Sequence, residues 1–432
     1  MATALRQPSI NSLQHADRAV HDWYRFVLSY PPHLVRDYLE RFAVGADQCV
    51  LDPFCGTGTT LVECKKLGVP SVGLEFNAMA HLASTVKTDW TPDPDALVAH
   101  ASAVATEAKA QLVAEGVEDN PFIVTGPQPG MALRTLPDEA AALLLRDSLS
   151  PLPMHKALAL LDVLQARADA RFLAHEQVAF ARSLVAASSN LKFGPEVGVG
   201  PAKLDAPVVT PWLAAVRAMA DDLRAVGKRA ATPAVVHHAD ARDAGSVLAP
   251  QSIDAVVTSP PYPNEKDYTR TTRLESVLLG LTRTKAELRR LKQHLVRSNT
   301  RSVYVADDDD RWVAEHPEIA RLSTEIERRR LALGKTSGFE RMYARVTRLY
   351  FGGMARHFAD LRAVLKPGAR LAYVVGDQAS YLQVLIRTGE ILADLARGLG
   401  YEVLGIDLFR TRLATATREQ LREEVVLLRW PG

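Results

Sequence analysis

The sequence predicts an α/β fold with a mainly parallel, doubly wound sheet and two largely helical insertions. Short apolar runs that end in turns containing Gly or Pro alternate with helical stretches, which is typical of strands buried between two layers of helices. Two such α/β segments are separated by a long stretch rich in Ala and Leu. At 432 residues the chain exceeds one ordinary domain, so we expect one domain with sizeable insertions, or two domains.

The first α/β segment reads as strand, turn, helix and strand. A strand over 49–51 leads into a glycine-containing turn, a helix follows over 59–67, and a second strand covers 71–74 and ends at Glu75. This order of elements is that of the doubly wound folds, in which consecutive strands are parallel.

The second α/β segment starts with a strand over 234–236. The apolar strand 254–257 follows and is broken by the Pro-Pro pair at 260–261. Further along we predict a turn and four more elements: the turn 366–368, a strand over 369–375, a helix from about 382 to 399, and closing strands over 401–406 and 424–429.

The two insertions set the expected domain organisation. In the first insertion we predict helices over 138–145 and 155–164 and a turn-rich connection over 190–201. In the second we predict a charged helical segment, in which the acidic cluster 307–310 forms a solvated loop. The chain then divides into five parts. These are an N-terminal half of the α/β domain at 20–91, a helical insertion at 92–228, a second α/β part at 229–262, a basic helical insertion at 263–345, and a C-terminal part at 346–432.

Composition bounds the class of protein. Apolar residues make up 47% and charged residues 24% of the chain, as in soluble globular proteins. No run of eighteen apolar residues and no signal-peptide core near the N-terminus stand out, so we expect a cytoplasmic protein without a membrane partner. The three cysteines lie in no CxxC pair, which argues against disulfides and a metal site. With a net charge of +2, binding to nucleic acid would require locally concentrated positive charge.

The first motif, DPFCGTGTT at 52–60, follows a strand and opens a helix. Gly56 and Gly58 permit a tight turn and the close approach of a ligand, towards which free N–H groups of the helix start would point. Glu75 lies at the spacing at which an acid accepts hydrogen bonds from both hydroxyls of a ribose. The third glycine of a dehydrogenase motif is replaced by Leu61, and no GK pair of a phosphate loop is present. A merely tight turn is the alternative interpretation.

The second motif, TSPPY at 258–262, follows a buried strand, and its two prolines fix a stiff extended backbone. An exocyclic amino nitrogen is a poor nucleophile because its lone pair is delocalised into the ring. The Ser259 side chain and the Pro260 carbonyl are suited to accept hydrogen bonds from both of its N–H groups, which favours a tetrahedral nitrogen. Tyr262 offers a flat face to a base rotated out of the stack. The alternative is a Pro-Pro loop with a core tyrosine.

Together the two motifs resemble motifs I and IV of the amino-methyltransferases that modify N6 of adenine or N4 of cytosine in DNA. The resemblance covers the two α/β segments and implies a Rossmann-like fold with S-adenosylmethionine as methyl donor. Family members usually carry Ser before the two prolines when they methylate cytosine N4, and Asp or Asn when they methylate adenine N6. Ser259 therefore implies cytosine N4, with adenine N6 as the alternative. Family members whose first motif has a similar sequence usually carry TSPPY before it in the chain. Here TSPPY comes after the first motif, so the motif order is permuted.

The resemblance also implies roles for single residues. Its candidate cofactor-binding residues are Asp52, Phe54, Gly56, Gly58, Thr59, Glu75, Phe76 and Asp240. The motif residues 52–58 would surround the methionine part, Glu75 would hold the ribose, Phe76 would lie against the adenine, and Asp240 would contact the adenine amino group, unless it is an ordinary strand-end turn. The segment 21–42 resembles the family's N-terminal helix motif near the methionine end. The candidate catalytic residues are Ser259, Pro260, Pro261 and Tyr262.

The resemblance makes 20–91 the cofactor-binding half and 229–262 the catalytic-loop half of the α/β domain, and it leaves 263–345 as the candidate for target recognition. A locally basic segment of this insertion follows the second motif. It supplies the candidate DNA-binding residues Lys266, Arg270, Arg273, Arg289 and Arg290. Lysine and arginine side chains there would neutralise phosphates beside the base pocket, although a solvated helix with pairs such as Glu287 and Arg290 explains any one of them equally well. The implied partners are double-stranded DNA and a cognate restriction endonuclease that acts separately, with the chain as a monomer or homodimer.

The mechanism implied is direct in-line methyl transfer to cytosine N4 of a flipped base, without a covalent intermediate. Attack on cytosine C5 would need a nucleophilic cysteine in a Pro-Cys context, and Cys55 is better explained as a packing residue. One rival is an RNA methyltransferase acting on guanine N2, but such enzymes usually have Asp before the prolines. Another is a DNA-binding protein without catalysis, against which the presence of Asp52, Glu75 and Ser259 argues.

Overall fold

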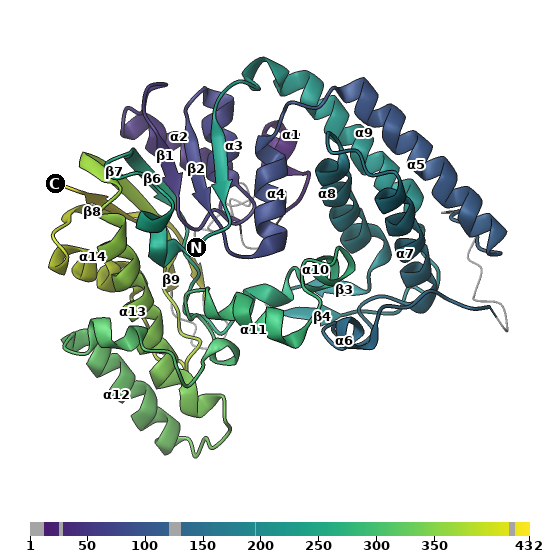
Figure 1. The fold of residues 1–432 in the computed structure, drawn as a ribbon. Coiled ribbons are helices and arrows are strands. Elements are labelled where there is room, and N and C mark those ends of the chain that lie inside the picture. Colours follow the sequence, from purple (N-terminus) through teal and green to yellow (C-terminus); the bar gives the residue numbers. More distant parts are fainter. Residues whose placement is uncertain (1–12, 26–28, 121–130, 195, 414–419) are drawn as a thin grey trace, which may run out of the picture.

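A seven-stranded sheet lies at the centre of the computed structural model, which describes residues 13–25, 29–120, 131–194, 196–413 and 420–432. The strand order is β5-β2-β1-β6-β7-β9-β8 (Figure 1). The neighbouring strands from β5 to β7 pair in parallel, whereas β9 runs antiparallel to both of its neighbours, β7 and β8. The mainly parallel α/β sheet that the sequence predicts is confirmed. The N-terminal stretch 1–12, where no signal-peptide core is expected, lies outside the described residues.

Each strand of this sheet corresponds to an apolar run of the sequence. The strands are β1 Val50–Asp52, β2 Ser71–Leu74, β5 Ala234–His237, β6 Ile253–Thr258, β7 Leu365–Gly376, β8 Glu402–Leu413 and β9 Gln420–Arg429. The prediction of a turn over 366–368 ahead of β7 is wrong. Leu365 already pairs with Ile253, and the register shifts before Arg370 pairs with Ala255, so this segment is an irregularity inside a longer strand.

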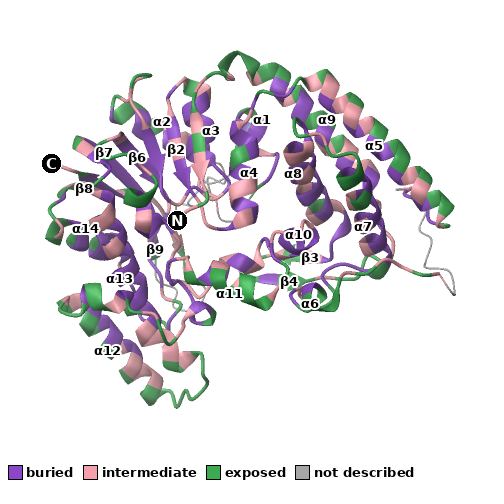
Figure 2. Ribbon diagram, in the orientation of Figure 1, coloured by how far each residue is buried: buried purple, intermediate pink, exposed green. Residues whose placement is uncertain are grey.

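Alternate residues of the strands pack against different helices, so the sheet is covered on both faces. Val50 and Val257 belong to a core with α2 (Pro32–Arg41), whereas Leu51 and Val256 belong to a core with α13 (Tyr343–Leu361) and α14 (Thr388–Gly398). Figure 2 accordingly shows buried residues along the inner strands of the sheet, whereas the edge strands β5 and β8 are intermediate or exposed. The helix predicted from 382 begins only at Thr388, since Leu382 and Gln383 have positive φ angles and Gln378 bridges to Ile386.

The first insertion forms a helical arm beside the sheet (Figure 1). Helices α3 (Thr59–Leu67) and α4 (Ala78–Thr88) precede it, and a core around the fully buried Trp212 joins α4 to the arm's helices α5 Pro94–Ala114, α7 Pro151–Ala166, α8 Leu173–Ser183 and α9 Val209–Val226. The helix predicted over 155–164 lies within α7, whereas α6 spans only Asp138–Ala141. The connection 190–201 contains a hairpin of β3 (Leu191–Phe193) and β4 (Val197–Val199), which the sequence analysis did not predict.

The second insertion, with α10 (Arg273–Leu278), α11 (Lys285–Gln293) and α12 (Pro317–Ala332), starts directly after the second motif. The prediction that its acidic cluster is a solvated loop is wrong. Asp309 is buried and accepts a hydrogen bond from the buried Arg242, and Asp307 accepts one from Arg297 at 2.7 Å. Asp309 is buried with a guanidinium partner from outside the insertion, and the half-buried Asp307 is paired with an arginine of the basic segment itself.

The order of the strands places the two motifs at one position. From β1 the chain continues to β2 and β5 on one side of the sheet, whereas β6 and β7 follow on the other side of β1, so the strand order reverses between β1 and β6. Ligands of open parallel sheets bind at the carboxyl ends of the strands at such a switch point. β1 ends in the first motif and β6 ends in the second. Within the described residues, no helix is both long and apolar enough to cross a membrane.

Candidate functional site

The two motifs leave neighbouring parallel strands and are joined by a buried hydrogen bond. Leu51 of β1 pairs with Val256 of β6, so both strands end at the same level of the sheet. There the hydroxyl of Thr258 donates to the Asp52 carboxylate at 2.5 Å. The first residue of the second motif is therefore held directly by the first residue of the first.

Asp52 also connects the N-terminal segment to this junction. Its side chain is fully buried and accepts hydrogen bonds from the backbone N–H of Phe54 and from the hydroxyl of Tyr30, both at 3.1 Å. Tyr30 in turn bonds to the hydroxyl of Thr60. Burial raises the pKa of Asp52 to about 6, although the hydrogen bonds from Thr258, Thr60 and Tyr30 act in the opposite direction.

The two glycines of the first motif are needed for different structural reasons. Both Gly56 and Gly58 have φ angles in the left-handed region, at +52° and +82°. A Cβ on Gly58 would lie 3.1 Å from the Cβ of Ser84 in α4, so this glycine allows the turn to pack closely on α4. A Cβ on Gly56 would meet its nearest atom only at 4.0 Å, so the backbone there is open to a ligand. Cys55 is buried against Gly73 of β2, as expected for a packing residue.

Glu75 lies at the end of β2 and turns its carboxylate towards the first motif. It accepts hydrogen bonds from the backbone N–H of Gly56 at 3.0 Å and from that of Asn77 at 2.7 Å. Burial raises the pKa of Glu75 to about 7. Each carboxylate oxygen can accept a further hydrogen bond. The geometry therefore leaves Glu75 able to bind vicinal hydroxyls beside the loop.

An aromatic surface follows Glu75. The ring of Phe76 stacks on His294 with 4.0 Å and on His238 with 4.8 Å between ring centroids. Asp240 lies nearby, since its carboxylate is 3.7 Å from His294. That carboxylate is buried and accepts three hydrogen bonds from Arg242, two from the guanidinium at 2.6 and 3.0 Å and one from the backbone N–H at 2.9 Å. His294 belongs to no motif and lies in the second insertion, more than two hundred residues after Phe76, so its role is not apparent from the sequence.

In the second motif the hydroxyl of Ser259 donates to the backbone carbonyl of Val374 on β7 at 3.0 Å. A hydroxyl has one hydrogen and two acceptor lone pairs, so this bond leaves the oxygen as an acceptor. The backbone N–H of Tyr262 donates to the hydroxyl of Tyr268, and the Tyr262 ring lies so close to Gly376 that a Cβ there would be 3.2 Å away. Burial raises the pKa of Tyr262, so its phenol stays neutral.

The candidate DNA-binding residues differ in exposure. Arg289 and Arg290 on α11 are exposed, and the guanidinium of Arg289 lies 5.0 Å from the centre of the Tyr304 ring. Lys266, Arg270 and Arg273 are half-buried. Arg273 donates to the hydroxyl of Thr269 at 2.6 Å, so it is engaged within the protein. The two arginines of α11 are thus the members of this set that are free to reach a phosphate backbone.

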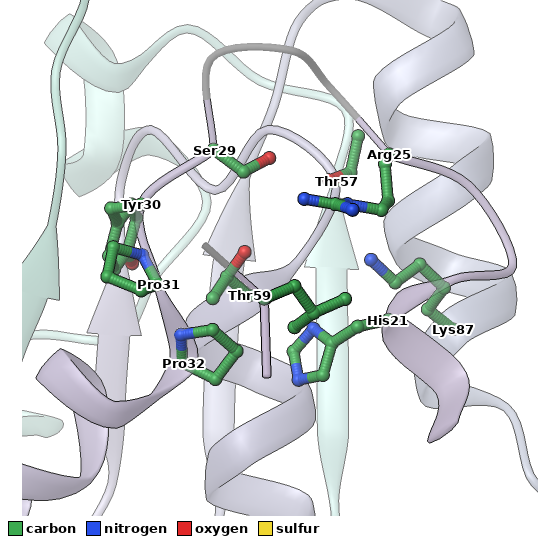
Figure 3. Close-up of a pocket in the computed structure, with 10 residues that line it drawn as sticks. His21, Arg25, Ser29, Tyr30, Pro31, Pro32, Thr57, Thr59 and Lys87 are labelled. Atoms are coloured by element: carbon green, nitrogen blue, oxygen red, sulfur yellow. The ribbon is translucent and has the colours of Figure 1, made fainter. Parts of the chain in front are cut away.

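A small pocket beside the start of α3 contains residues that the sequence analysis missed (Figure 3). It lies between the N-terminal segment, the first motif and α4, and is lined by Leu13, His21, Arg25, Ser29, Tyr30, Pro31, Pro32, Thr57, Thr59 and Lys87. Lys87 carries no recognisable motif, because in the sequence it is one lysine in a helical stretch. Only the folded chain brings it to the first motif.

Comparison with known proteins agrees with this site. Residues 10–85 match a family model for N6/N4 methyltransferases described as DNA methylase. Over 96% of its length the chain is 24% identical to the type II methyltransferase M.BsoBI of Geobacillus stearothermophilus, covering 84% of that protein. It is also 29% identical to the type II methyltransferase M.AvaI of a Nostoc strain, over 41% of this chain and 38% of the relative. A third relative, the type II methyltransferase M.MjaII of Methanocaldococcus jannaschii, is 38% identical over 16% of this chain and 13% of its own length.

The matched residues contain the whole first motif, Glu75 and most of α4, which form one wall of the site described above. Together, the mixed seven-stranded sheet and these similarities support a DNA methyltransferase that uses S-adenosylmethionine as its methyl donor, and the matched segment is similar to the N6/N4 DNA methylases.

Proposed function

We propose that this enzyme transfers a methyl group from S-adenosylmethionine to the exocyclic N4 of cytosine in double-stranded DNA, as the modifying enzyme of a type II restriction-modification system. The observation that carries the choice of an amino group is the bond from Ser259 to the Val374 carbonyl, which leaves the serine oxygen as an acceptor. The relatives named as type II methyltransferases support the biological setting, in which a restriction endonuclease acts separately.

The residues at the switch point fit the cofactor. The open backbone at Gly56, with Asp52, Phe54, Gly58 and Thr59, would hold the methionine part; Glu75, already turned towards the loop, would bind the ribose hydroxyls. Phe76, whose ring stacks on two imidazoles, and Asp240 would hold the adenine. S-adenosylmethionine supplies an electrophilic methyl group on a sulfonium.

The second motif prepares the nucleophile. The Ser259 oxygen accepts a hydrogen bond from one N–H of the cytosine amino group, and the Pro260 carbonyl accepts one from the other, so that the nitrogen becomes tetrahedral and its lone pair is localised. Pro260 and Pro261 keep the backbone extended and the carbonyl fixed. The amino nitrogen attacks the methyl group in line, and the proton that the nitrogen then loses passes to water.

The target base has to leave the duplex to reach this site. The Tyr262 ring, supported by β7 at Gly376, is the flat surface against which it would rest. The second insertion begins at this point of the chain, and the exposed Arg289 and Arg290 on α11 would neutralise phosphates. We therefore assign target recognition to residues 263–345, the insertion that also contains the half-buried Lys266, Arg270 and Arg273.

Methylation of adenine N6 is the alternative, since the same acceptors would serve an adenine amino group. Ser259 favours cytosine by its resemblance to the cytosine-N4 enzymes. The two products differ in mass and in the nucleoside that carries them, so one experiment separates the two activities.

Replacing Ser259 with Ala removes one acceptor and should reduce turnover by about 10²-fold, because the lost hydrogen bond is strongest in the transition state. Binding of S-adenosylhomocysteine should change less than about twofold, since the serine does not touch the cofactor. The measurement is tritium transfer from S-adenosylmethionine to plasmid DNA, followed by mass spectrometry of the nucleosides. The wild-type product should be N4-methylcytosine. N6-methyladenine as the product, or an unchanged rate in S259A, would refute the proposal.

The double substitution of Arg289 and Arg290 with Ala should weaken DNA binding at low salt. It should also lower the slope of log K against log salt by about 2, since each phosphate contact releases about one counterion. Fluorescence anisotropy with a labelled duplex at several salt concentrations measures both effects. The matched control replaces Arg321 and Arg328 on α12, which are exposed and pair with glutamates within their own helix. Equal slopes for both double variants would argue against α11 as the phosphate-binding element.

The raised pKa of Glu75, about 7, predicts a pH dependence for a ligand that has the ribose but no amino-acid part. The ionised carboxylate accepts hydrogen bonds from both hydroxyls, so the affinity for 5′-methylthioadenosine should rise from pH 6 to pH 8 by up to about tenfold. Titration calorimetry measures this affinity. In the Glu75→Gln variant binding should be weaker and this rise should disappear. A variant that retains the same rise would show that another group titrates.

A further inference from the structure

The pocket beside α3 holds more positive charge than the residues around it neutralise. Lys87 of α4 lines it and is 1% exposed. Its ammonium has three hydrogens to donate, and it donates a hydrogen bond of 3.3 Å to the backbone carbonyl of Tyr24. Among the described residues no carboxylate forms an ion pair with Lys87. A buried ammonium without an anion is energetically unfavourable.

The second cation of the pocket is Arg25, which is exposed and contacts Asp22 only at 3.9 Å. Figure 3 shows its guanidinium and the Lys87 ammonium pointing towards the same space, beside the hydroxyl groups of Thr57 and Thr59. His21 also lines the pocket but bonds to Glu63 at 2.7 Å, and burial lowers its pKa to about 4, so it is neutral there. Lys87 and Arg25 are therefore the charges that a ligand would meet.

The start of α3 adds donors of its own. Thr59 is the first residue of this nine-residue helix, whose N-cap Gly58 has no side chain to cap the free N–H groups. Burial, together with the nearby positive charges of Lys66 and Arg25, lowers the pKa of Lys87 to about 7. An anion in the pocket would stabilise the charged form of Lys87 and so raise this pKa. Cations, hydroxyl groups and a helix start together form a site for a small anionic group.

The position of the pocket indicates which anion it is. Its lining includes Thr57 and Thr59 of the first motif but neither Glu75 nor Phe76, so it is separate from the residues that would hold the ribose and the adenine. We propose that Lys87, with Arg25 and the first turn of α3, binds the carboxylate of the methionine part of S-adenosylmethionine. This inference rests on the cofactor placement of the proposed function. Lys87 then orients the cofactor and takes no part in the chemistry of methyl transfer.

The test compares two ligands that differ in this carboxylate. S-adenosylhomocysteine carries the amino-acid part, and 5′-methylthioadenosine has the same nucleoside without it. In the Lys87→Met variant, affinity for S-adenosylhomocysteine should fall by about 10- to 100-fold, as for loss of a charged hydrogen bond, while affinity for 5′-methylthioadenosine changes less than about twofold. Titration calorimetry measures both affinities without DNA, so the result does not depend on which base is methylated.

Lys65→Met is the matched control. Lys65 is also a buried lysine, but its ammonium donates to the carbonyls of Ala230 and Thr232, away from the pocket. This variant should treat both ligands alike. Arg25→Gln changes an exposed residue and so tests the site even if Lys87→Met does not fold; it should weaken S-adenosylhomocysteine selectively, with a smaller effect.

Two results would overturn the inference. Equal losses for both ligands in Lys87→Met and Arg25→Gln would show that these residues only support the fold. A loss of DNA affinity in Arg25→Gln with unchanged binding of S-adenosylhomocysteine would show that the anion is a DNA phosphate.

Discussion

One buried carboxylate determines how the parts of this enzyme meet. Asp52 accepts hydrogen bonds from the second motif through Thr258, from its own loop through Phe54, and from the N-terminal segment through Tyr30. Because a buried carboxylate without partners is costly, each donor is held where Asp52 requires it. The cofactor loop and the loop that we assign to the target base thus become one rigid unit at the switch point of the sheet.

This junction explains why the insertions do not disturb the site. The first insertion packs on α4, which also carries Lys87 and the contact between Ser84 and Gly58. The second starts after Tyr262 and is fixed to the sheet end by the buried pair of Arg242 and Asp309. Each insertion is anchored next to one half of the site. The two motifs therefore keep their positions in space although their order along the chain is permuted.

The sequence predicted the parts whose determinants are local. Apolar runs located the strands of the sheet, and the glycines and prolines located both motif loops, because these residues restrict the backbone wherever they occur. The burial of Asp309 was not predictable, since its partner Arg242 lies 67 positions away and local charge density suggested a solvated loop. The same reason applies to Lys87 and to His294. Each matters only through neighbours that folding brings to it.

The most direct test of this account is the pair of substitutions Thr258→Val and Thr258→Ser, because Thr258 is placed to hold Asp52 and not to touch either substrate. Loss of this buried hydrogen bond is expected to cost about 1–3 kcal/mol, so Thr258→Val should lower both S-adenosylhomocysteine affinity and the methyl-transfer rate by about tenfold or more. Thr258→Ser keeps the hydroxyl and should retain both. Wild-type affinity and rate in Thr258→Val would contradict the claim that one carboxylate couples the two motifs.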